Sequence, residues 1–391
     1  MKNSIDLKRD KGKNPLIILV HAPLGVGGVT NLMLNIQRNI DRKLLNFDYL
    51  VFHDRIEPKE QFVYSMGSKK LIASADNIKF KPLRGIIRLF KIRNVCKNNN
   101  VKIFHFNGGA PLGFLTMFAA KCGGVKWITF HSHNGGMSNE GFLVKPISAI
   151  CKPLLNLVVD DYWACSSIAA RFSFPRSIVR GKKYYFMPNA IDLHKFKYNE
   201  KIRKQVRNEL GLSGKFVIGH AGRFNRQKNH AFLIDIFAEI HRKDSNAVLV
   251  LFGVGELQES IKNKVNALEL NDYVLFYGAS NQMNRMYQAM DVFLMPSLFE
   301  GLPVVGVEAQ AAGLPIVFSD VITREVGVAP NIEYLSLKEP VDIWANKVLK
   351  FKNAKRTDYC RELEEAGFDQ DKMVAHFEKY YLDVGKKLKL I

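Results

Sequence analysis

Short apolar runs alternate with longer amphipathic stretches along the whole chain. A short apolar run is typical of a buried strand, and the stretch after each one has the spacing of a helix. Strands that alternate with helices form βαβ units with parallel sheets. We therefore expect an α/β fold, with strands at residues 15–23, 48–52, 102–106, 126–131 and 161–165 in the first half and at 216–223, 247–253, 273–278, 291–297 and 315–320 in the second.

The alternation is interrupted near residues 187–196, where Pro188-Asn189 breaks the pattern. A chain of 391 residues is long enough for two domains. We therefore expect two Rossmann-like domains that face each other across a cleft, one at residues 1–187 and one at residues 188–391. The last helix, at about residues 370–385, is expected to cross back to the first domain.

Ligands of such folds bind at the carboxyl ends of the strands, so the loops there carry the candidate chemistry. The loop after the first strand contains Gly27 and Gly28 and precedes a helix. Glycine allows close approach to the backbone, and a helix N-terminus offers free N–H groups to a phosphate. The loop has neither the GxGxxG spacing nor the Lys-Ser/Thr pair of a P-loop, and a simple tight turn is the alternative.

Two histidines, His131 and His133, end a predicted strand and are followed by Asn134. Residues two apart on a strand project to the same side. Their imidazoles could contact a substrate hydroxyl or transfer a proton. No nearby carboxylate or cysteine completes a metal site. A structural, hydrogen-bonded role is the alternative for both histidines.

Two cations, Arg223 and Lys228, follow the first strand of the second half. A guanidinium forks onto phosphate oxygens, and an ammonium adds a compact charge. Together they could bind a diphosphate and stabilise it as it leaves. Ordinary surface basicity is the alternative.

The most informative segment runs from Pro296 to Pro315 and contains two acids. Glu308 lies on an otherwise apolar helix, where a carboxylate needs a hydrogen-bonding partner such as a pair of ribose hydroxyls. Glu300 lies in the preceding loop and could bind sugar hydroxyls beside the N–H groups of Gly301 and Leu302. Helix capping or an ion pair is the alternative for both acids.

Glu300 and Glu308, with seven residues between them, resemble the E-x7-E motif of glycosyltransferase family 4 (group 1). Residues 188–196 resemble the Asn-Gly-Ile-Asp-x-x-x-Phe linker of that family, although Ala190 replaces the usual glycine. The resemblance covers nearly the whole chain.

Three further segments carry the same resemblance. Residues 222–228 resemble the diphosphate site of the family, and residues 252–255 and 276–278 resemble the strand ends beside its nucleotide. His131-Ser-His133-Asn134 is similar to the His-Ser-His-Asn of transferases that build bacterial capsule and exopolysaccharide repeats.

The resemblance implies a GT-B fold, an acceptor-binding first domain and a nucleotide-sugar-binding second domain. It implies retaining transfer of a sugar from a nucleotide diphosphate donor, with UDP as the nucleotide and with no metal or other cofactor. The catalytic residues it implies are His131, Arg223, Lys228 and Glu300. The donor-binding residues it implies are Gly27, Gly28, Arg223, Lys228, Gly255, Tyr277, Glu300, Gly301, Leu302 and Glu308. The acceptor-binding residues it implies are His133 and Asn134.

Charge is spread unevenly along the chain. The formal net charge is +20, and residues 1–185 hold 29 Lys and Arg against 11 Asp and Glu. Between Asp76 and Glu140 there are ten basic residues and no acid. This asymmetry indicates a polyanionic partner for the first half, such as nucleic acid, anionic lipid or a phosphorylated substrate.

Residues 81–91 have the pattern of an amphipathic helix. Its apolar side chains are Leu83, Ile86, Ile87 and Phe90, and its cations are Arg84, Arg88 and Lys91. The helix could lie on an anionic membrane, or it could pack its apolar face on the first sheet and leave its charges solvated. A lipid-linked glycan acceptor would explain the basic half, so we expect a cytoplasmic protein that is peripheral on the inner face of the cell membrane.

Composition excludes several classes of protein. A hydrophobic content of 47% suits a chain with sizeable cores, and no apolar run reaches the ~18 residues of a membrane span. Five scattered cysteines without a CxxC pair argue against a disulfide framework or a zinc site. Two alternatives remain. The chain could be a nucleic-acid-binding protein, although its sequence has no helix-turn-helix, RRM or zinc-finger signature. It could also be another Rossmann-type nucleotide-dependent enzyme.

Overall fold

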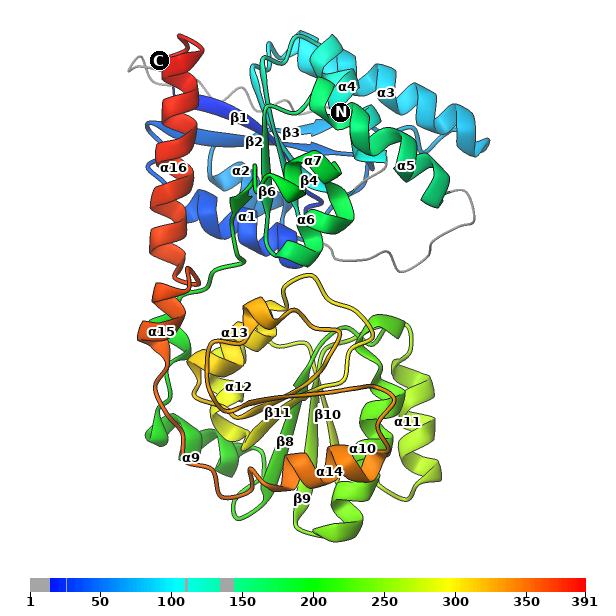
Figure 1. The fold of residues 1–391 in the computed structure, drawn as a ribbon, viewed down its shortest axis with the longest axis vertical. Coiled ribbons are helices and arrows are strands. Elements are labelled where there is room, and N and C mark those ends of the chain that lie inside the picture. The colour runs from blue at the N-terminus through cyan, green and yellow to red at the C-terminus, as the bar shows by residue number, and fades with distance from the viewer. Residues whose placement is uncertain (1–14, 26, 110–111, 134–143) are drawn as a thin grey trace. The chain divides into compact units, whose positions relative to one another are not determined.

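The computed structural model describes residues 15–25, 27–109, 112–133 and 144–391. These residues form two compact units (Figure 1). Unit 1 comprises the described residues up to 133 together with 144–187 and 371–391, and unit 2 comprises residues 188–370. Each unit is built on one parallel β-sheet flanked by helices, so the predicted α/β fold is confirmed.

Unit 1 contains a seven-stranded sheet of order β3-β2-β1-β4-β5-β6-β7. The strands are β1 (Leu16–His21), β2 (Leu45–Val51), β3 (Lys70–Ile72), β4 (Ile103–Gly108), β5 (Trp127–Ser132), β6 (Asp161–Ala164) and β7 (Tyr185–Phe186). The five strands expected from the sequence are all present. The edge strands β3 and β7 are missing from the prediction because they are too short to form an apolar run, and their residues are at most half-buried.

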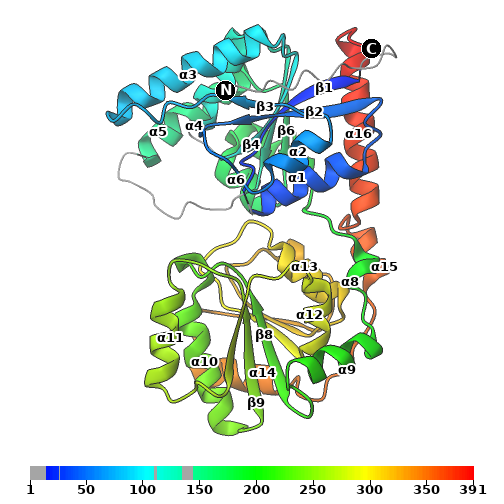
Figure 2. The ribbon, with the colours of Figure 1, turned by 180° about the vertical axis from the view of Figure 1, so that it is seen from behind.

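Helices cover both faces of this sheet, as the opposite views of Figures 1 and 2 show. They are α1 (Gly28–Asn39), α2 (Glu60–Ser65), α3 (Lys81–Asn98), α4 (Leu112–Cys122), α5 (Val144–Leu154), α6 (Ser167–Ser173), α7 (Arg176–Arg180) and α16 (Gln370–Lys387). On β4, Phe106 packs against Gly113 of α4, whereas His105 lies 2.5 Å from the hydroxyl of Tyr381 on α16. Successive strand residues point to opposite faces, so α4 and α16 cover different sides of the sheet.

The C-terminal helix α16 packs on unit 1 through aromatic side chains. The buried ring of Trp163 lies 4.7 Å from that of Tyr380 and 5.6 Å from that of Phe377. The hydroxyl of Tyr380 accepts from the indole N–H of Trp127 at 3.0 Å and donates to Asp161 at 2.5 Å. These polar contacts satisfy the groups that the aromatic packing removes from water.

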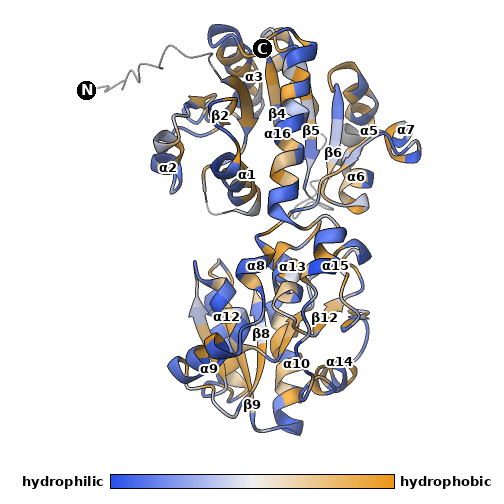
Figure 3. Ribbon diagram, turned by 90° about the vertical axis from the view of Figure 1, so that its left-hand side faces the viewer, coloured by the Kyte–Doolittle hydropathy of each residue, from blue (hydrophilic) through white to orange (hydrophobic). Residues whose placement is uncertain are grey.

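Unit 2 contains a six-stranded sheet of order β10-β9-β8-β11-β12-β13. Its strands are β8 (Phe216–Ala221), β9 (Ala247–Phe252), β10 (Val274–Gly278), β11 (Val292–Met295), β12 (Ile316–Ser319) and β13 (Ile332–Leu335). All five expected strands are present; β13 is an unpredicted edge strand of half-buried residues. Strands β8 and β9 are buried throughout and are mainly orange in Figure 3. Buried runs of this kind are typical of central parallel strands.

The helices of unit 2 surround this sheet. They are α8 (Leu193–Phe196), α9 (Glu200–Glu209), α10 (His230–Lys243), α11 (Gln258–Ala267), α12 (Met283–Ala289), α13 (Val304–Ala311), α14 (Val341–Leu349) and α15 (Cys360–Glu365). In the described parts of both units, no helix is long and apolar enough to cross a bilayer.

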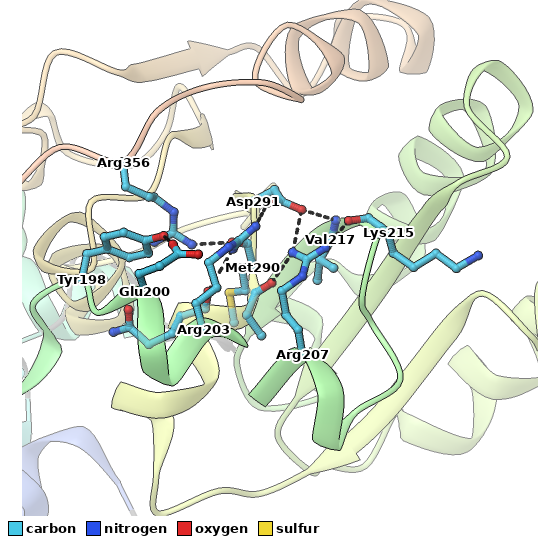
Figure 4. A network of polar contacts seen from close by, with 12 residues as sticks. Tyr198, Glu200, Arg203, Arg207, Lys215, Val217, Met290, Asp291 and Arg356 are labelled. Atoms are coloured by element: carbon cyan, nitrogen blue, oxygen red, sulfur yellow. Dashed lines mark hydrogen bonds and ion pairs between the residues drawn. The ribbon is translucent and has the colours of Figure 1, made fainter. Parts of the chain in front are cut away.

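Ion pairs around Asp291 fasten α9 to the end of α12 (Figure 4). Arg203 Nη2 and Arg207 Nη1 lie 2.5 and 3.1 Å from the two carboxylate oxygens. The guanidinium of Arg356 donates to the backbone carbonyl of Tyr287 at 3.2 Å. Cations at the carbonyl end of a helix are electrostatically favourable. The network therefore fixes α12, which carries a residue of the candidate site.

Candidate functional site

Lys228 and Glu300 form an ion pair in unit 2. Lys228 Nζ lies 2.7 Å from Glu300 Oε1, and both side chains are largely buried. Gln227 completes the contact, because its side-chain amide donates to Glu300 Oε2 and to the carbonyl oxygen of Phe299, each at 3.0 Å. The structure thus brings together two of the residues predicted from separate loops. An ammonium has three donors and a carboxylate about four acceptor sites, so each group retains capacity for a ligand.

The loop that carries Lys228 has a tightly determined shape. Asn225 caps the short 3-10 helix Arg226–Lys228 by accepting the backbone N–H of Lys228 at 3.2 Å. Asn229 adopts a left-handed conformation with φ 55°, and its amide donates to the carbonyl oxygen of Pro296 at 3.1 Å. A side chain at Gly255 would collide with the backbone of Phe224. The predicted donor residue Gly255 is therefore glycine because two loops meet there.

Glu300, Gly301 and Leu302 lead directly into helix α13. Pro303 occupies the N-cap, where no side chain caps the helix. The N–H of Gly306 donates to the carbonyl oxygen of Pro303 at 3.0 Å, and the other N–H groups of the first turn, with the helix dipole, make this end suitable for a negatively charged group. The carbonyl oxygen of Leu302 accepts the side-chain amide of Asn189 at 3.3 Å, so the linker segment supports this loop.

Glu308 lies one helical turn inside α13 and is bonded to Tyr287 of α12. The Tyr287 hydroxyl donates to Glu308 Oε2 at 2.8 Å and also lies 3.3 Å from the carbonyl oxygen of Val305. Burial raises the pKa of Glu308 to about 7, although the bond from Tyr287 and the charge of Lys195 both lower it. The residue as a whole is partly exposed, whereas its carboxyl group is surrounded by protein, and its contact with a ribose stays a prediction.

Arg223 and Tyr277 are the exposed members of the predicted donor set. Arg223 Nη2 lies 3.1 Å from Glu256 Oε2, in a pair that is mostly solvent-accessible. Such a pair stabilises the fold little, so Arg223 is free to exchange its partner for a phosphate. The ring of Tyr277, at the end of β10, lies 5.0 Å from that of Phe252 and is 38% exposed.

His131 and His133 lie in a buried network in unit 1. His133 Nε2 lies 2.7 Å from Asn107 Oδ1, and His105 Nε2 lies 3.2 Å from the same oxygen. His131 Nδ1 lies 3.3 Å from His105 Nε2, and His105 Nδ1 faces the hydroxyl of Tyr381. An amide oxygen only accepts, so this network assigns the proton of His105 and of His133 to Nε2.

Burial holds the pKa of His131 well below its usual range, and the neighbouring His133 and His105 lower it further. The side chain is therefore neutral at physiological pH and suits hydrogen bonding better than a standing positive charge. Both histidines have the surroundings expected for the structural alternative, and their substrate contacts stay predictions. Asn134 lies outside the described residues.

Gly27 and Gly28 lie at the N-terminus of α1. Gly27 is the N-cap with an ordinary φ of −81°, and no side chain caps this helix. Both residues are exposed, and a Cβ at Gly28 would meet no other atom within 4 Å. Neither backbone conformation nor packing accounts for glycine at these positions, and their contact with a ligand stays a prediction.

Sequence reasoning missed three polar residues of these sites: Gln227, Tyr287 and Asn107. Gln227 lies between Arg226 and Lys228 in the predicted diphosphate loop, and only this position in the sequence pointed to it. Tyr287 and Asn107 come from elements without a motif. Among the described residues, no three His, Cys, Asp or Glu side chains are grouped so that they could hold a metal ion.

The described site in unit 2 therefore offers an ammonium, two carboxylates and a free helix N-terminus. Cationic and N–H groups suit a diphosphate, and carboxylates accept the hydroxyls of a ribose or a sugar. The same elements agree with comparisons to known proteins. Residues 202–370 match the family model described as glycosyl transferases group 1.

The chain is also similar to individual proteins over nearly its full length. It is 30% identical to EpsF of Bacillus subtilis, which is named as a glycosyltransferase, over 93% of this chain and 96% of that protein. It is 26% identical to the UDP-Gal:alpha-D-GlcNAc-diphosphoundecaprenol alpha-1,3-galactosyltransferase of Escherichia coli, over 78% of this chain and 80% of that enzyme.

Among solved structures, HepE of Anabaena in complex with UDP-glucose superposes with a TM-score of 0.69 at 15% identity, covering 96% of this chain and all of that chain. This likeness confirms the predicted GT-B fold. The match to EpsF extends over almost the whole of both proteins, and the chain therefore belongs to group 1 of the glycosyl transferases.

Proposed function

We propose that this glycosyltransferase moves a sugar from a UDP-sugar to a lipid-linked glycan acceptor in cell-surface polysaccharide synthesis, with retention of anomeric configuration. The observation that carries the proposal is the Lys228–Glu300 ion pair beside the free N-terminus of α13. A cation suits the diphosphate of such a donor, and a carboxylate suits the hydroxyls of its sugar.

In this proposal Lys228 and Arg223 bind the donor diphosphate, and Glu308 accepts the ribose hydroxyls. Glu300 binds the transferred sugar, and the N–H groups of Gly301 and Leu302 touch sugar or phosphate. Gly255 and Tyr277 lie beside the nucleotide. The roles of Gly27, Gly28, His131 and His133 are carried over from the family resemblance.

The reaction breaks the bond between the anomeric carbon and the diphosphate oxygen and forms a bond from that carbon to the acceptor oxygen. The acceptor proton passes to the departing phosphate, and UDP leaves. Lys228 and the α13 N-terminus stabilise the charge that develops on the diphosphate, as preorganised cations and dipoles do. Neither Glu300 nor Glu308 serves as a covalent nucleophile in this scheme.

Two comparisons support the choice of donor and acceptor. The similar Escherichia coli enzyme is named for a UDP-galactose donor and a diphosphoundecaprenol-linked acceptor. HepE, which shares the fold, binds UDP-glucose. The basic first half of the chain agrees with an acceptor carried on a lipid diphosphate.

A thermal-shift experiment tests the donor class. UDP is expected to raise the melting temperature, whereas NAD leaves it unchanged. The substitution Lys228→Gln should abolish most of the UDP shift, and the exposed-site control Glu259→Gln on α11 should retain it. A shift with NAD and none with UDP would contradict the proposal.

A further inference from the structure

Helix α3 turns its apolar side chains outward. Leu83, Ile86 and Phe90 are 45%, 53% and 62% exposed, and Phe80 at the N-cap is 68% exposed. Only Ile92 and Cys96, in its second half, are buried. The first three turns thus present Leu83, Ile86 and Phe90 to solvent, whereas Ile87, the fourth residue of the predicted apolar face, is partly buried.

The cations of the same turns point toward the protein. Arg84 Nε donates to the carbonyl oxygen of Ile78 at 2.8 Å, and Lys91 Nζ donates to that of Ser74 at 2.5 Å. The guanidinium of Arg88 lies 5.3 Å from the ring centroid of Phe52. The sequence also allowed the apolar face to pack on the sheet and the charges to stay solvated. Leu83, Ile86 and Phe90 do not pack in this way.

The neighbouring helices α4 and α5 also carry exposed apolar groups. Helix α3 packs on α4 and α4 packs on α5, and Figures 1 and 2 show the three together on one side of unit 1. Exposed large side chains on or directly after α4 and α5 are Leu115, Phe118, Ile150, Leu154 and Leu157. Large apolar groups exposed on helices that pack together are typical of an interaction site.

Positive charge accompanies this surface. Arg93 and Lys97 follow Phe90 on α3 at the i+3 and i+7 positions, so they extend the exposed row along the same face. The chain has no acid between Asp76 and Glu140, a stretch that includes α3 and α4. A surface that binds a protein usually carries charges of both signs. A surface that binds an anionic membrane instead carries apolar groups flanked only by cations.

We propose that the outward face of α3, with the exposed apolar residues of α4 and α5, docks on an anionic lipid membrane. Leu83, Ile86 and Phe90 enter the interface between headgroups and acyl chains, and Arg93 and Lys97 contact anionic headgroups. This interaction goes beyond the transfer reaction and does not depend on it, because it needs neither donor nor acceptor.

Vesicle sedimentation of the full chain tests the proposal. Vesicles of phosphatidylcholine mixed with phosphatidylglycerol are expected to bind the protein at low salt, and vesicles of phosphatidylcholine alone should bind it more weakly. The double substitution Ile86→Glu with Phe90→Glu should lower the partition coefficient at least about tenfold, because both groups leave the acyl region. The double substitution Arg93→Gln with Lys97→Gln should lower it about tenfold for anionic vesicles only.

The control is Leu268→Glu, which replaces a 41% exposed leucine of unit 2 and should bind like the parent protein. All substituted side chains are exposed, so the melting temperature and the UDP response should be unchanged. Failure of the parent protein to bind anionic vesicles at low salt overturns the proposal, as does undiminished binding by both double variants. One further result would show that the proposal is wrong. If the parent protein is a dimer that binds no vesicle, and Ile86→Glu with Phe90→Glu makes it monomeric, then the outward face of α3 binds a second copy of the chain.

Discussion

Donor affinity is predicted to rise with pH through the titration of Glu308. Burial raises the pKa of this carboxyl group from 4.5 to about 7. With that pKa, about 10% of the protein carries an ionised Glu308 at pH 6 and about 90% at pH 8. If only the carboxylate accepts the ribose hydroxyls, the Kd for a UDP-sugar should fall about tenfold over this range.

Isothermal titration calorimetry with UDP-glucose measures this dependence, because a sugar-linked diphosphate has no ionisation between these pH values. Two other buried groups of unit 2 do not interfere. The pKa of His230 is lowered to about 4 by burial and by Lys228, and the pKa of His220 is also lowered, chiefly by burial. Both imidazoles therefore stay neutral throughout.

The substitution Glu308→Gln should remove the pH dependence and weaken binding by about 10- to 100-fold at pH 8, which corresponds to about 1.5–3 kcal/mol for a hydrogen bond to a charged group. A Kd of the parent protein that does not change with pH would refute the reasoning. If the Kd of the Glu308→Gln variant changed with pH as much as that of the parent protein, another group would be responsible for the titration.

The same shift predicts how stability depends on pH. A carboxyl group whose pKa is raised by folding stabilises the fold fully below its unfolded pKa, and this contribution is lost as pH rises through the folded pKa. A shift from 4.5 to about 7 corresponds to about 3 kcal/mol lost between pH 5 and pH 8. Urea denaturation of the parent protein should show this loss, and the Glu308→Gln variant should lack it.

Four further substitutions have expected outcomes. Lys228→Gln should lower turnover about 100-fold in a steady-state UDP-release assay, because in the proposed mechanism this ammonium stabilises the leaving diphosphate. Asp291→Asn should lower the free energy of unfolding in urea by about 3 kcal/mol, because Arg203 and Arg207 lose their carboxylate; a loss below about 1 kcal/mol would contradict this reasoning. Tyr381→Phe should lower the same free energy by about 1 kcal/mol, since His105 loses a hydrogen bond. Gly255→Ala should weaken UDP-sugar binding in calorimetry, because its Cβ would collide with the backbone of Phe224; unchanged affinity would show that the loop tolerates the methyl group.

Much of the fold was predictable because central parallel strands are buried on both sides. Strands such as β8 and β9 are continuous apolar runs, and their positions follow directly from the pattern. The edge strands β3, β7 and β13 lie where fewer residues are buried, so their sequences carry no such signal. The outward orientation of α3 was also not predictable, because an amphipathic pattern defines two faces without saying which one meets the protein.

The site was predictable where a residue type is unusual in its surroundings. Glu308 stood out as a carboxylate in an apolar helix, and its raised pKa follows from that position. The ion pair between Lys228 and Glu300 joins loops 72 residues apart, and only the folded chain brings them together. Tyr287 carries no sequence signal, because its role depends on the packing of α12 beside α13.

Sugar transfer itself is the central claim, and proton NMR of the reaction tests it most directly. A UDP-sugar mixed with a sugar linked to a lipid diphosphate should yield UDP and a new glycoside with the anomeric configuration of the donor. The substitution Glu300→Ala should abolish product formation, whereas Glu259→Gln should not change it. A product of inverted configuration, or undiminished transfer by the Glu300→Ala variant, would contradict the account.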